Sequence, residues 1–200
     1  MQTLRKLFAL PSFWAALALL LLHGLLIFAR KDSQIVYGDS GLMYLQTRQL
    51  LESDYATFAF DYPGASIDPE REFLPYRKPF LAKVDAKYYI DFPPYFPLLA
   101  APFYGFLGHP GLYLPGFLSL AGTLFLLIGC AGLAGLGRAG RTSVLLLYGL
   151  ASTVTMYNYI FHEYPLALFF WTAAFFFVLK IERALNRKAK EALGDMRPGK

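Results

Sequence analysis

The sequence predicts an all-α membrane protein, a polytopic helix bundle with about four spans and amphipathic juxtamembrane helices in a long outer loop. Hydrophobic residues make up 56% of the 200 residues and charged residues only 16%, whereas soluble domains carry about 25% charged residues. Over 92–181 the charged side chains are limited to Arg138, Arg141, Glu163 and Lys180. Uncharged apolar runs of this length indicate an integral membrane protein, which we treat as a single membrane domain over 1–200.

Each predicted span is an apolar run, and about 20 such residues in a helix cross the roughly 30 Å hydrocarbon core. Four segments meet or approach this length, at residues 13–29, 112–136, 142–161 and 164–179. The last is short, but the Lys180 side chain can reach the interface. The first follows Arg5 and Lys6 as a signal peptide would. Its apolar run exceeds the usual ~7–15 residues and no small-x-small cleavage site follows, so we expect an uncleaved span.

The basic residues predict the orientation of these spans. Lys and Arg are enriched on the cytoplasmic side, which places the N-terminus, the loop at 137–141 and the tail at 180–200 in the cytoplasm. The outer side then receives a long loop over 30–91 and a short turn near 157–163. The overall prediction is a multi-pass protein of the bacterial inner membrane with both termini cytoplasmic.

Proline residues complicate the segment that follows the outer loop. Prolines at 93, 94, 97, 102 and 110 interrupt an apolar heart, at 98–107, that is too short to span. We interpret 93–108 as an interfacial or partly re-entrant helix. In the alternative, this segment crosses and one of the basic loops lies outside.

The net charge of +5 does not indicate a nucleic-acid partner, because of how the charge is distributed. The outer loop is acidic in balance, and the basic residues concentrate in the tail directly after a span. This pattern is typical of a topology signal that touches anionic lipid. The single cysteine, Cys130, lies in an apolar run and cannot form an internal disulfide.

A short helix is predicted just beyond the first span, at 40–53. Asp39 and Ser40 are favourable residues before a helix, and Leu42 and Leu45 share one face with polar residues opposite. We expect this helix to lie at the membrane surface, with Gln46 facing water. Asp39 then either caps the helix or serves a functional site.

Glu163 is the second candidate carboxylate. It is the only acidic residue over 92–181 and lies at the outer end of a span, on the side predicted for Asp39. A carboxylate beside an apolar bundle is costly and is by default a functional candidate. The alternative is an exposed turn residue. The neighbouring His162 is interpreted as an interfacial side chain, because no second His or Cys lies nearby in the sequence.

A basic cluster closes the outer loop and consists of Arg77, Lys78, Lys83 and Lys87. Cations at headgroup depth can hold a phosphate or pyrophosphate. The alternative is a solvated loop face. Together with two carboxylates and a Pro/aromatic segment, such cations suit chemistry on a lipid-linked phosphate, in which a carboxylate takes a proton from an acceptor and cations stabilise the departing phosphate.

The order of motifs resembles a known family. The stretches "GDSGLMYLQTRQLLES", "FPPYFPLLAAPFYGFLG" and "FHEYPLALFFWTAAFFF" follow the first span in the order seen at the N-terminus of GT-C-type membrane glycosyltransferases, the group that contains the protein O-mannosyltransferases and the aminoarabinose lipid A transferases. The resemblance implies that Asp39 is the catalytic base and that Glu163 lies near acceptor, donor or metal. It matches Lys78 to a basic-Pro element near the donor phosphate. Apart from the resemblance, Arg77, Lys83 and Tyr95 are further substrate-binding candidates.

Two departures from the family affect these expectations. Asp39-Ser40-Gly41 stands where the family often has Asp-Glu or Asp-x-Asp, so no cofactor is assigned, and Asp39 and Glu163 are the ligands if a divalent metal binds. Family members are also usually longer, with more spans.

We therefore weigh two functions. One is transfer of a hexosyl or pentosyl group from a polyprenyl-phosphate donor to a lipid, glycan or protein acceptor. The other is a non-catalytic module that binds polyprenyl lipid or a partner chain that completes the bundle. A channel or transporter is disfavoured, because few polar residues lie within the spans.

Overall fold

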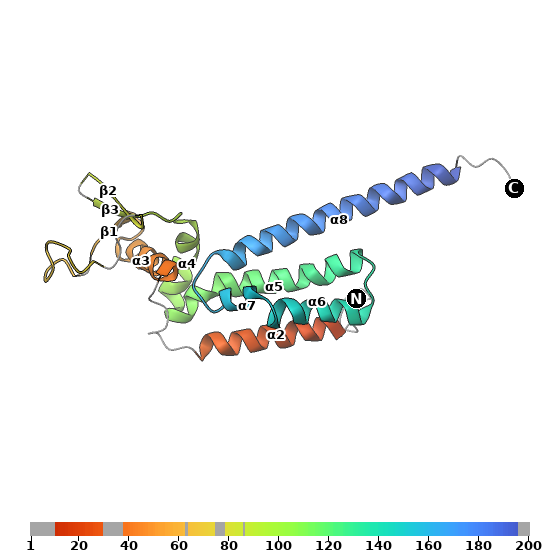
Figure 1. Cartoon of the computed structure of the whole chain (residues 1–200), viewed down its shortest axis with the longest axis horizontal. Helices are drawn as coiled ribbons and strands as arrows, with labels where there is room; N and C mark the ends of the chain where they lie inside the picture. The colour runs from red at the N-terminus through yellow and green to blue at the C-terminus, as the bar shows by residue number, and fades with distance from the viewer. Residues whose placement is uncertain (1–10, 30–37, 63, 75–78, 86, 196–200) are drawn as a thin grey trace. The chain divides into compact units, whose positions relative to one another are not determined.

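The computed structural model describes residues 11–29, 38–62, 64–74, 79–85 and 87–195, most of them helical. In chain order the elements are α2 (Pro11–Phe28), α3 (Gly38–Glu52), β1 (Ala59–Phe60), β2 (Leu81–Val84), β3 (Lys87–Ile90), α4 (Tyr95–Leu107), α5 (His109–Leu133), α6 (Arg138–Leu150), α7 (Thr153–Tyr157) and α8 (Tyr164–Asp195) (Figure 1). The chain divides into two compact units. We call them the helical unit (described residues 11–25, 117–157 and 164–195) and the mixed unit (described residues from 26 to 116, with 158–163).

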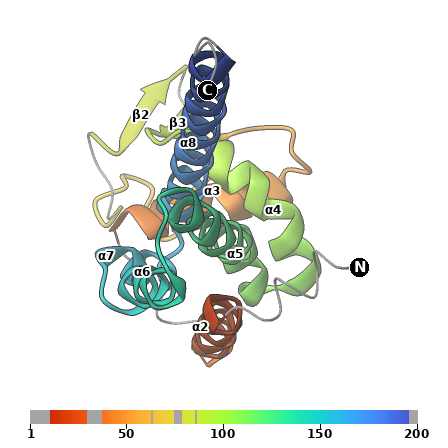
Figure 2. The same ribbon diagram turned by 90° about the vertical axis from the view of Figure 1, so that its right-hand side faces the viewer.

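Three helices are long and apolar enough to cross a membrane, namely α2, α5 and the part of α8 over Tyr164–Ala192. They match three of the four expected spans. Within the helical unit, α5 lies between α2 and α8 when viewed end-on (Figure 2). A core of small and aliphatic side chains joins α2, α5 and α6, and its buried members are Ala16, Leu19, Leu120, Leu124, Ile128 and Leu145.

Two glycines allow α5 and α8 to approach closely. Gly122 and Gly129 lie two turns apart on α5, and the rings of Phe169 and Phe176 on α8 pack directly over them. A Cβ added to Gly129 would lie 2.6 Å from Phe176 Cε2, which is closer than real contacts allow. Small residues serve this purpose in membrane helix packing, because they let a neighbouring side chain reach the backbone.

The segment expected to be one span over 142–161 is divided in the structure. α6 ends at Leu150 and α7 covers only Thr153–Tyr157. The hydroxyl of Ser152 donates to the carbonyl of Tyr148 at 2.6 Å, and that of Thr155 donates to the same carbonyl at 3.5 Å. Side-chain hydroxyls that bond to helix carbonyls compete with the backbone ladder, which accounts for the break.

The segment predicted as a cytoplasmic tail over 180–200 begins within α8, which continues without interruption from its apolar part through Lys180 to Asp195. Its apolar part is almost entirely uncovered in the helical unit, and Trp171 and Phe175 are among its exposed side chains.

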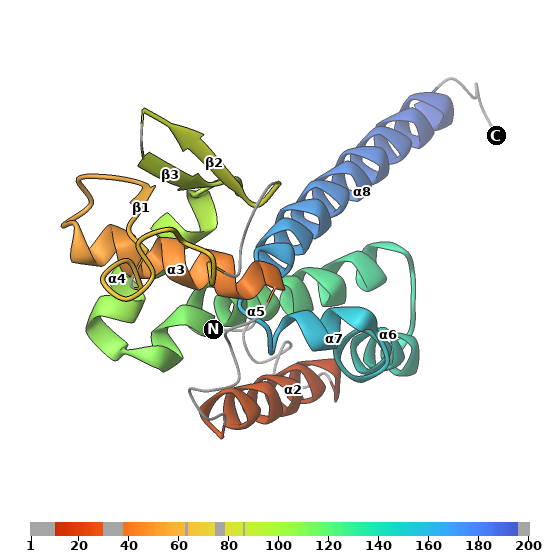
Figure 3. The ribbon, with the colours of Figure 1, turned by 60° about the vertical axis from the view of Figure 1, so that its left-hand side comes forward.

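The mixed unit contains a small sheet that the all-α prediction did not include. β1, β3 and β2 form an antiparallel sheet in that order, with Ala59 opposite Tyr89 and Leu81 opposite Ile90 (Figure 3). The sheet packs on α3 through a core of buried residues, namely Leu42, Phe60, Leu74, Leu81 and Ile90. The strands are two to four residues long, so their alternation was too brief to be recognised from the sequence.

α3 was predicted to lie at the membrane surface with Gln46 facing water, and the burial of Gln46 contradicts that expectation. Gln46 Nε2 donates to the carbonyl of Phe92 at 3.0 Å, and Gln49 Oε1 accepts from the amide of Asp61 at 3.3 Å. The side-chain amides of both glutamines thus bond to backbone groups outside helices and strands. These hydrogen bonds allow the polar face of α3 to be buried. The helix is therefore covered by other parts of the mixed unit.

α4 covers a second side of α3 and is the helix expected at 93–108. It begins after the Pro93-Pro94 pair and ends at Gly108, whose φ of 65° favours glycine and whose amide donates to the carbonyl of Tyr104. The hydroxyls of Tyr44 and Tyr104 lie 3.2 Å apart between the two helices. Burial and this hydrogen bond raise the pKa of Tyr104 to about 12, so its hydroxyl stays protonated at neutral pH.

The other face of α4 is apolar and exposed. Phe96, Pro97, Ala100 and Ala101 are buried, whereas the opposite residues Tyr95, Leu98, Leu99, Phe106 and Leu107 are exposed, with Phe106 at 88%. At about 1.5 Å per residue, a helix of this length is too short to cross the hydrocarbon core.

Candidate functional site

The two carboxylates selected from the sequence, Asp39 and Glu163, converge on one imidazole. His162 Nε2 lies 4.0 Å from Asp39 Oδ2, and His162 Nδ1 lies 2.9 Å from Glu163 Oε2. All three residues belong to the mixed unit, although Asp39 is more than a hundred positions from the others in the chain. The imidazole is nearly covered, with its side chain 8% exposed, whereas the carboxylates of Asp39 and Glu163 are 50% and 40% exposed.

Asp39 is positioned by α3. The helix begins at Gly38, so Asp39 lies in its first turn, where the helix dipole favours a negative charge. The following residues Leu42 and Met43 are each 1% exposed, and they fix the helix against the rest of the unit. The carboxylate therefore projects from a rigid element while remaining open to solvent.

His162 and Glu163 are positioned by an aromatic anchor. Phe161 is 1% exposed and packs against Phe96 of α4, with ring centroids 5.2 Å apart, and against Tyr113 of α5 at 6.5 Å. A fully buried aromatic side chain contributes strongly to packing and limits the freedom of its neighbours. The segment 158–163 is thus held in the mixed unit rather than left as an open turn between helices.

The electrostatics of the site favour an ionised Glu163. Its partial burial acts to raise its pKa, but the close approach of His162 Nδ1 to Oε2 and a backbone hydrogen bond of Glu163 outweigh this effect. The pKa of Glu163 therefore lies below its ordinary value, because both contacts favour the charged carboxylate.

This arrangement can move protons. A half-exposed carboxylate can accept a proton from a bound hydroxyl or amine, and an imidazole between two carboxylates can pass charge between them. His162 is the residue that sequence reasoning missed as a site member. Its position next to Glu163, the only acidic residue over 92–181, could have identified it as a site residue. Its approach to Asp39 could not be seen, because the two residues are far apart in the sequence.

Two of the other predicted site residues, Lys83 and Tyr95, lie in the described part of the chain. Lys83 lies on β2, where its ammonium is 5.8 Å from the centre of the Tyr88 ring, and Arg71 lies over the same ring at 4.2 Å. Tyr95 is the first residue of α4 and is exposed. Arg77 and Lys78 lie outside the described residues.

A metal ion was left open by the sequence, with Asp39 and Glu163 as its ligands. Over the described ranges, no group of three or more His, Cys, Asp or Glu side chains could hold a metal ion. A divalent metal at this site therefore stays a prediction.

The fold and site together define a largely helical protein with three helices long and apolar enough to cross a membrane, and with a pair of carboxylates joined by a histidine. Comparison of this chain with protein-family models, curated proteins and solved structures finds no match.

Proposed function

We propose that this chain is a membrane glycosyltransferase of the GT-C type, or the N-terminal part of one. It moves a hexosyl or pentosyl group from a polyprenyl-phosphate donor to a lipid, glycan or protein acceptor at the outer membrane face. The observation that supports this proposal most is the approach of Asp39 and Glu163 to His162. The two carboxylates were selected from their positions in the sequence and given roles by the resemblance, and they lie together in one folded unit.

The proposed reaction is an inverting displacement. Asp39 accepts the proton of the acceptor hydroxyl or amine as that atom bonds to the anomeric carbon, and the bond from this carbon to the donor phosphate oxygen breaks. The departing group is the polyprenyl phosphate, for which Arg77, Lys78 and Lys83 are the candidate cationic partners. Glu163 orients the acceptor or donor, and His162 holds its carboxylate in place.

The exposed apolar face of α4 supports a lipid-linked substrate. It belongs to the same unit as the carboxylates, and its neighbouring residue Phe96 packs on Phe161, directly before His162. An apolar helix face of this kind can rest at the boundary between headgroups and acyl chains. In the proposal, this face receives part of the polyprenyl chain.

The proposed location is the bacterial inner membrane with both termini in the cytoplasm. Three crossings would place the two ends on opposite sides, so this topology requires a fourth crossing. Within the described chain, α6 and α7 together provide the candidate for it, at the place where the sequence predicts the span 142–161. Their interrupted backbone requires neighbouring protein or water at that depth.

The experiment compares Asp39→Asn with a matched control. Asp91→Asn removes the charge of another exposed aspartate of the mixed unit, whose backbone amide donates to the carbonyl of Phe80 at 2.9 Å. Membranes containing each variant receive a panel of labelled polyprenyl-phosphate hexoses and pentoses, and transfer to endogenous acceptors is measured. We expect Asp39→Asn to lower the rate by about 10²–10⁴-fold, the usual contribution of general base catalysis, and Asp91→Asn to leave it unchanged. Full activity of Asp39→Asn refutes the assigned role.

A non-catalytic membrane module is the second candidate, and the uncovered apolar part of α8 favours it. A helix of this kind requires lipid or protein on nearly every side. Under this function, a partner chain that completes the bundle co-purifies with the protein in mild detergent, and Asp39→Asn does not affect the association. Purification without any partner protein or polyprenyl lipid argues against the module.

A further inference from the structure

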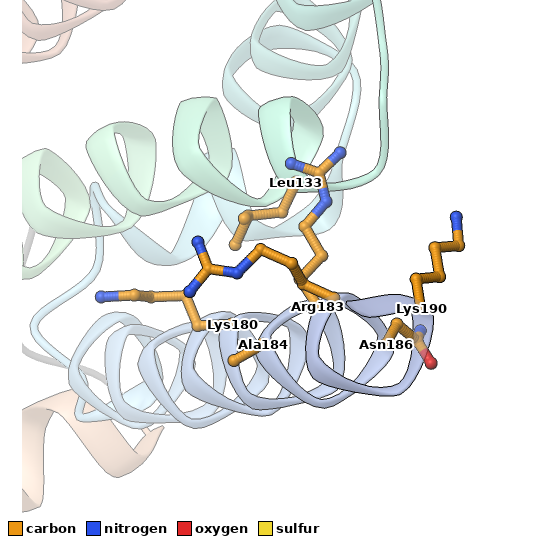
Figure 4. Close-up of a pocket in the computed structure, with 7 residues that line it drawn as sticks. Leu133, Lys180, Arg183, Ala184, Asn186 and Lys190 are labelled. Carbon is orange, nitrogen blue, oxygen red and sulfur yellow. The ribbon is translucent and has the colours of Figure 1, made fainter. Parts of the chain in front are cut away.

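A cleft lined by four cations lies in the helical unit where α8 passes the end of α5. Its volume is about 640 Å³, and it is formed by Leu133, Lys180, Arg183, Ala184, Asn186, Arg187 and Lys190 (Figure 4). The four cations share one face of α8, because positions 180, 183, 187 and 190 are separated by three, four and three residues. None of these residues belongs to the carboxylate site described above.

The positive charge of this cleft is only partly compensated. Within the described residues, the cleft cation that forms an ion pair is Arg187. Its guanidinium Nε lies 3.6 Å from Glu191 Oε1. Cations three and four residues apart on a helix repel one another, so the stripe is less favourable by itself than with an anion beside it. Guanidinium and ammonium groups at this spacing suit the oxygens of a phosphate group.

The place of the cleft along the helices indicates a lipid as the source of that phosphate. Leu133 is the last residue of α5, one of the candidate spans, and Lys180 is the first charged residue after the apolar part of α8. Lys180 Nζ lies 5.6 Å from the centre of the Phe176 ring, so its stem remains among apolar side chains while its charge reaches the cleft. α5 and the apolar part of α8 both end at this cationic cleft, which places it at the depth of lipid headgroups.

We propose that this cleft binds the headgroup phosphate of an anionic phospholipid. The proposal does not depend on sugar transfer, because it concerns a different unit of the chain and a different ligand. Arg183, Arg187 and Lys190 contact the phosphate oxygens, and Asn186 supplies a neutral donor. Leu133 borders the acyl side of the site.

The chain offers a matched pair of lysines for the test. Lys188 and Lys190 are both exposed, and they lie two positions apart on α8, yet only Lys190 lines the cleft. Lys190→Gln and Lys188→Gln therefore remove the same charge at almost the same depth. Arg183→Gln removes a second lining charge. Arg183→Lys keeps the charge but removes the paired N–H donors with which a guanidinium can bind two phosphate oxygens at once.

Native mass spectrometry of the full chain in neutral detergent measures the result, with dioleoylphosphatidylglycerol as the anionic lipid and dioleoylphosphatidylcholine as the zwitterionic lipid. We expect tighter binding of the anionic lipid, and a loss of about fivefold in its affinity for Lys190→Gln and for Arg183→Gln, the usual effect of one basic residue near a charged bilayer. Lys188→Gln should bind as the unaltered chain does, and Arg183→Lys should lie between.

Three outcomes overturn the proposal. Equal losses for Lys188→Gln and Lys190→Gln show diffuse attraction to the whole tail rather than a site. Equal affinity for the two lipids shows that the headgroup charge is not recognised. Displacement of the lipid by inorganic phosphate at the same concentration shows that the cleft binds free phosphate. Far-ultraviolet circular dichroism of each variant verifies that the helical content is retained, so none of these results reflects unfolding.

Discussion

The burial of α3 leads to a quantitative prediction for Leu42→Ala. Leu42 is 1% exposed and lies among Phe60, Leu74, Leu81 and Ile90 in the core between α3 and the sheet. Replacing a fully buried leucine with alanine removes apolar contacts and leaves a cavity, and the usual cost is about 2–5 kcal/mol. We take about 3 kcal/mol, since the mixed unit is small, and this corresponds to a roughly 150-fold increase in the open fraction of the unit.

Hydrogen–deuterium exchange of the full chain in detergent tests this value, because buried amides exchange through such opening. We expect amides of α3 and β3 to exchange roughly 150-fold faster in Leu42→Ala than in the unaltered chain. Leu99→Ala provides the control, because Leu99 lies on the exposed face of α4 and contributes little to this core. Equal exchange in the two variants would refute the reasoning. It would show that α3 lies on the membrane surface, as its sequence suggested, and is not part of a packed core.

Two further predictions concern the site and the helix packing. Because the pKa of Glu163 is lowered in the folded protein by His162, its charged form stabilises the fold above pH 4.5, and this contribution is lost as the pH falls through the lowered pKa. Glu163→Gln should therefore lower the melting temperature most at neutral pH. The lost stability should be below about 1 kcal/mol, because the side chain is half-exposed. A melting-temperature difference between Glu163→Gln and the unaltered chain that stays constant from pH 7 to acid would contradict this. Gly122→Val should destabilise the helical unit by about 1–3 kcal/mol, because Phe169 must move away. Gly137→Ala meets open space, so its melting temperature should match that of the unaltered chain, and equal effects of the two variants would argue against close packing of α5 and α8.

The long apolar helices were predictable because a helix that can cross a bilayer needs an apolar run of about 20 residues, which is visible in a sequence. The predicted run 13–29 corresponds to Pro11–Phe28, and 112–136 corresponds to His109–Leu133. The segment 142–161 has the composition of a span, but composition does not record the Ser152 and Thr155 hydroxyls that bond back to the helix. Local competition for carbonyl groups decides such a break, and it depends on rotamers rather than on hydropathy.

The mixed unit was harder to predict, because its stability comes from contacts between distant segments. The amphipathic pattern of α3 correctly indicated a helix, but the pattern does not say whether lipid or protein covers the helix. Gln46 looked solvent-facing because its partner, the carbonyl of Phe92, is a backbone group that any sequence supplies. For the same reason, Asp39 and Glu163 could each be selected from the sequence alone. His162 could be recognised as a partner of both only from the fold, which places it between them.

The assignment of Asp39, His162 and Glu163 to a single compact unit has a consequence for the response to different membranes. Spans tilt or bend when the bilayer becomes thicker or thinner, at a modest cost for each ångström of mismatch. The carboxylate site lies within this unit, where Phe161 packs on Phe96 of α4 and a separate core fixes α3. Under the proposed function, we therefore expect acyl-chain length to alter how readily a lipid-linked molecule enters the site, while the distances among the three side chains remain constant.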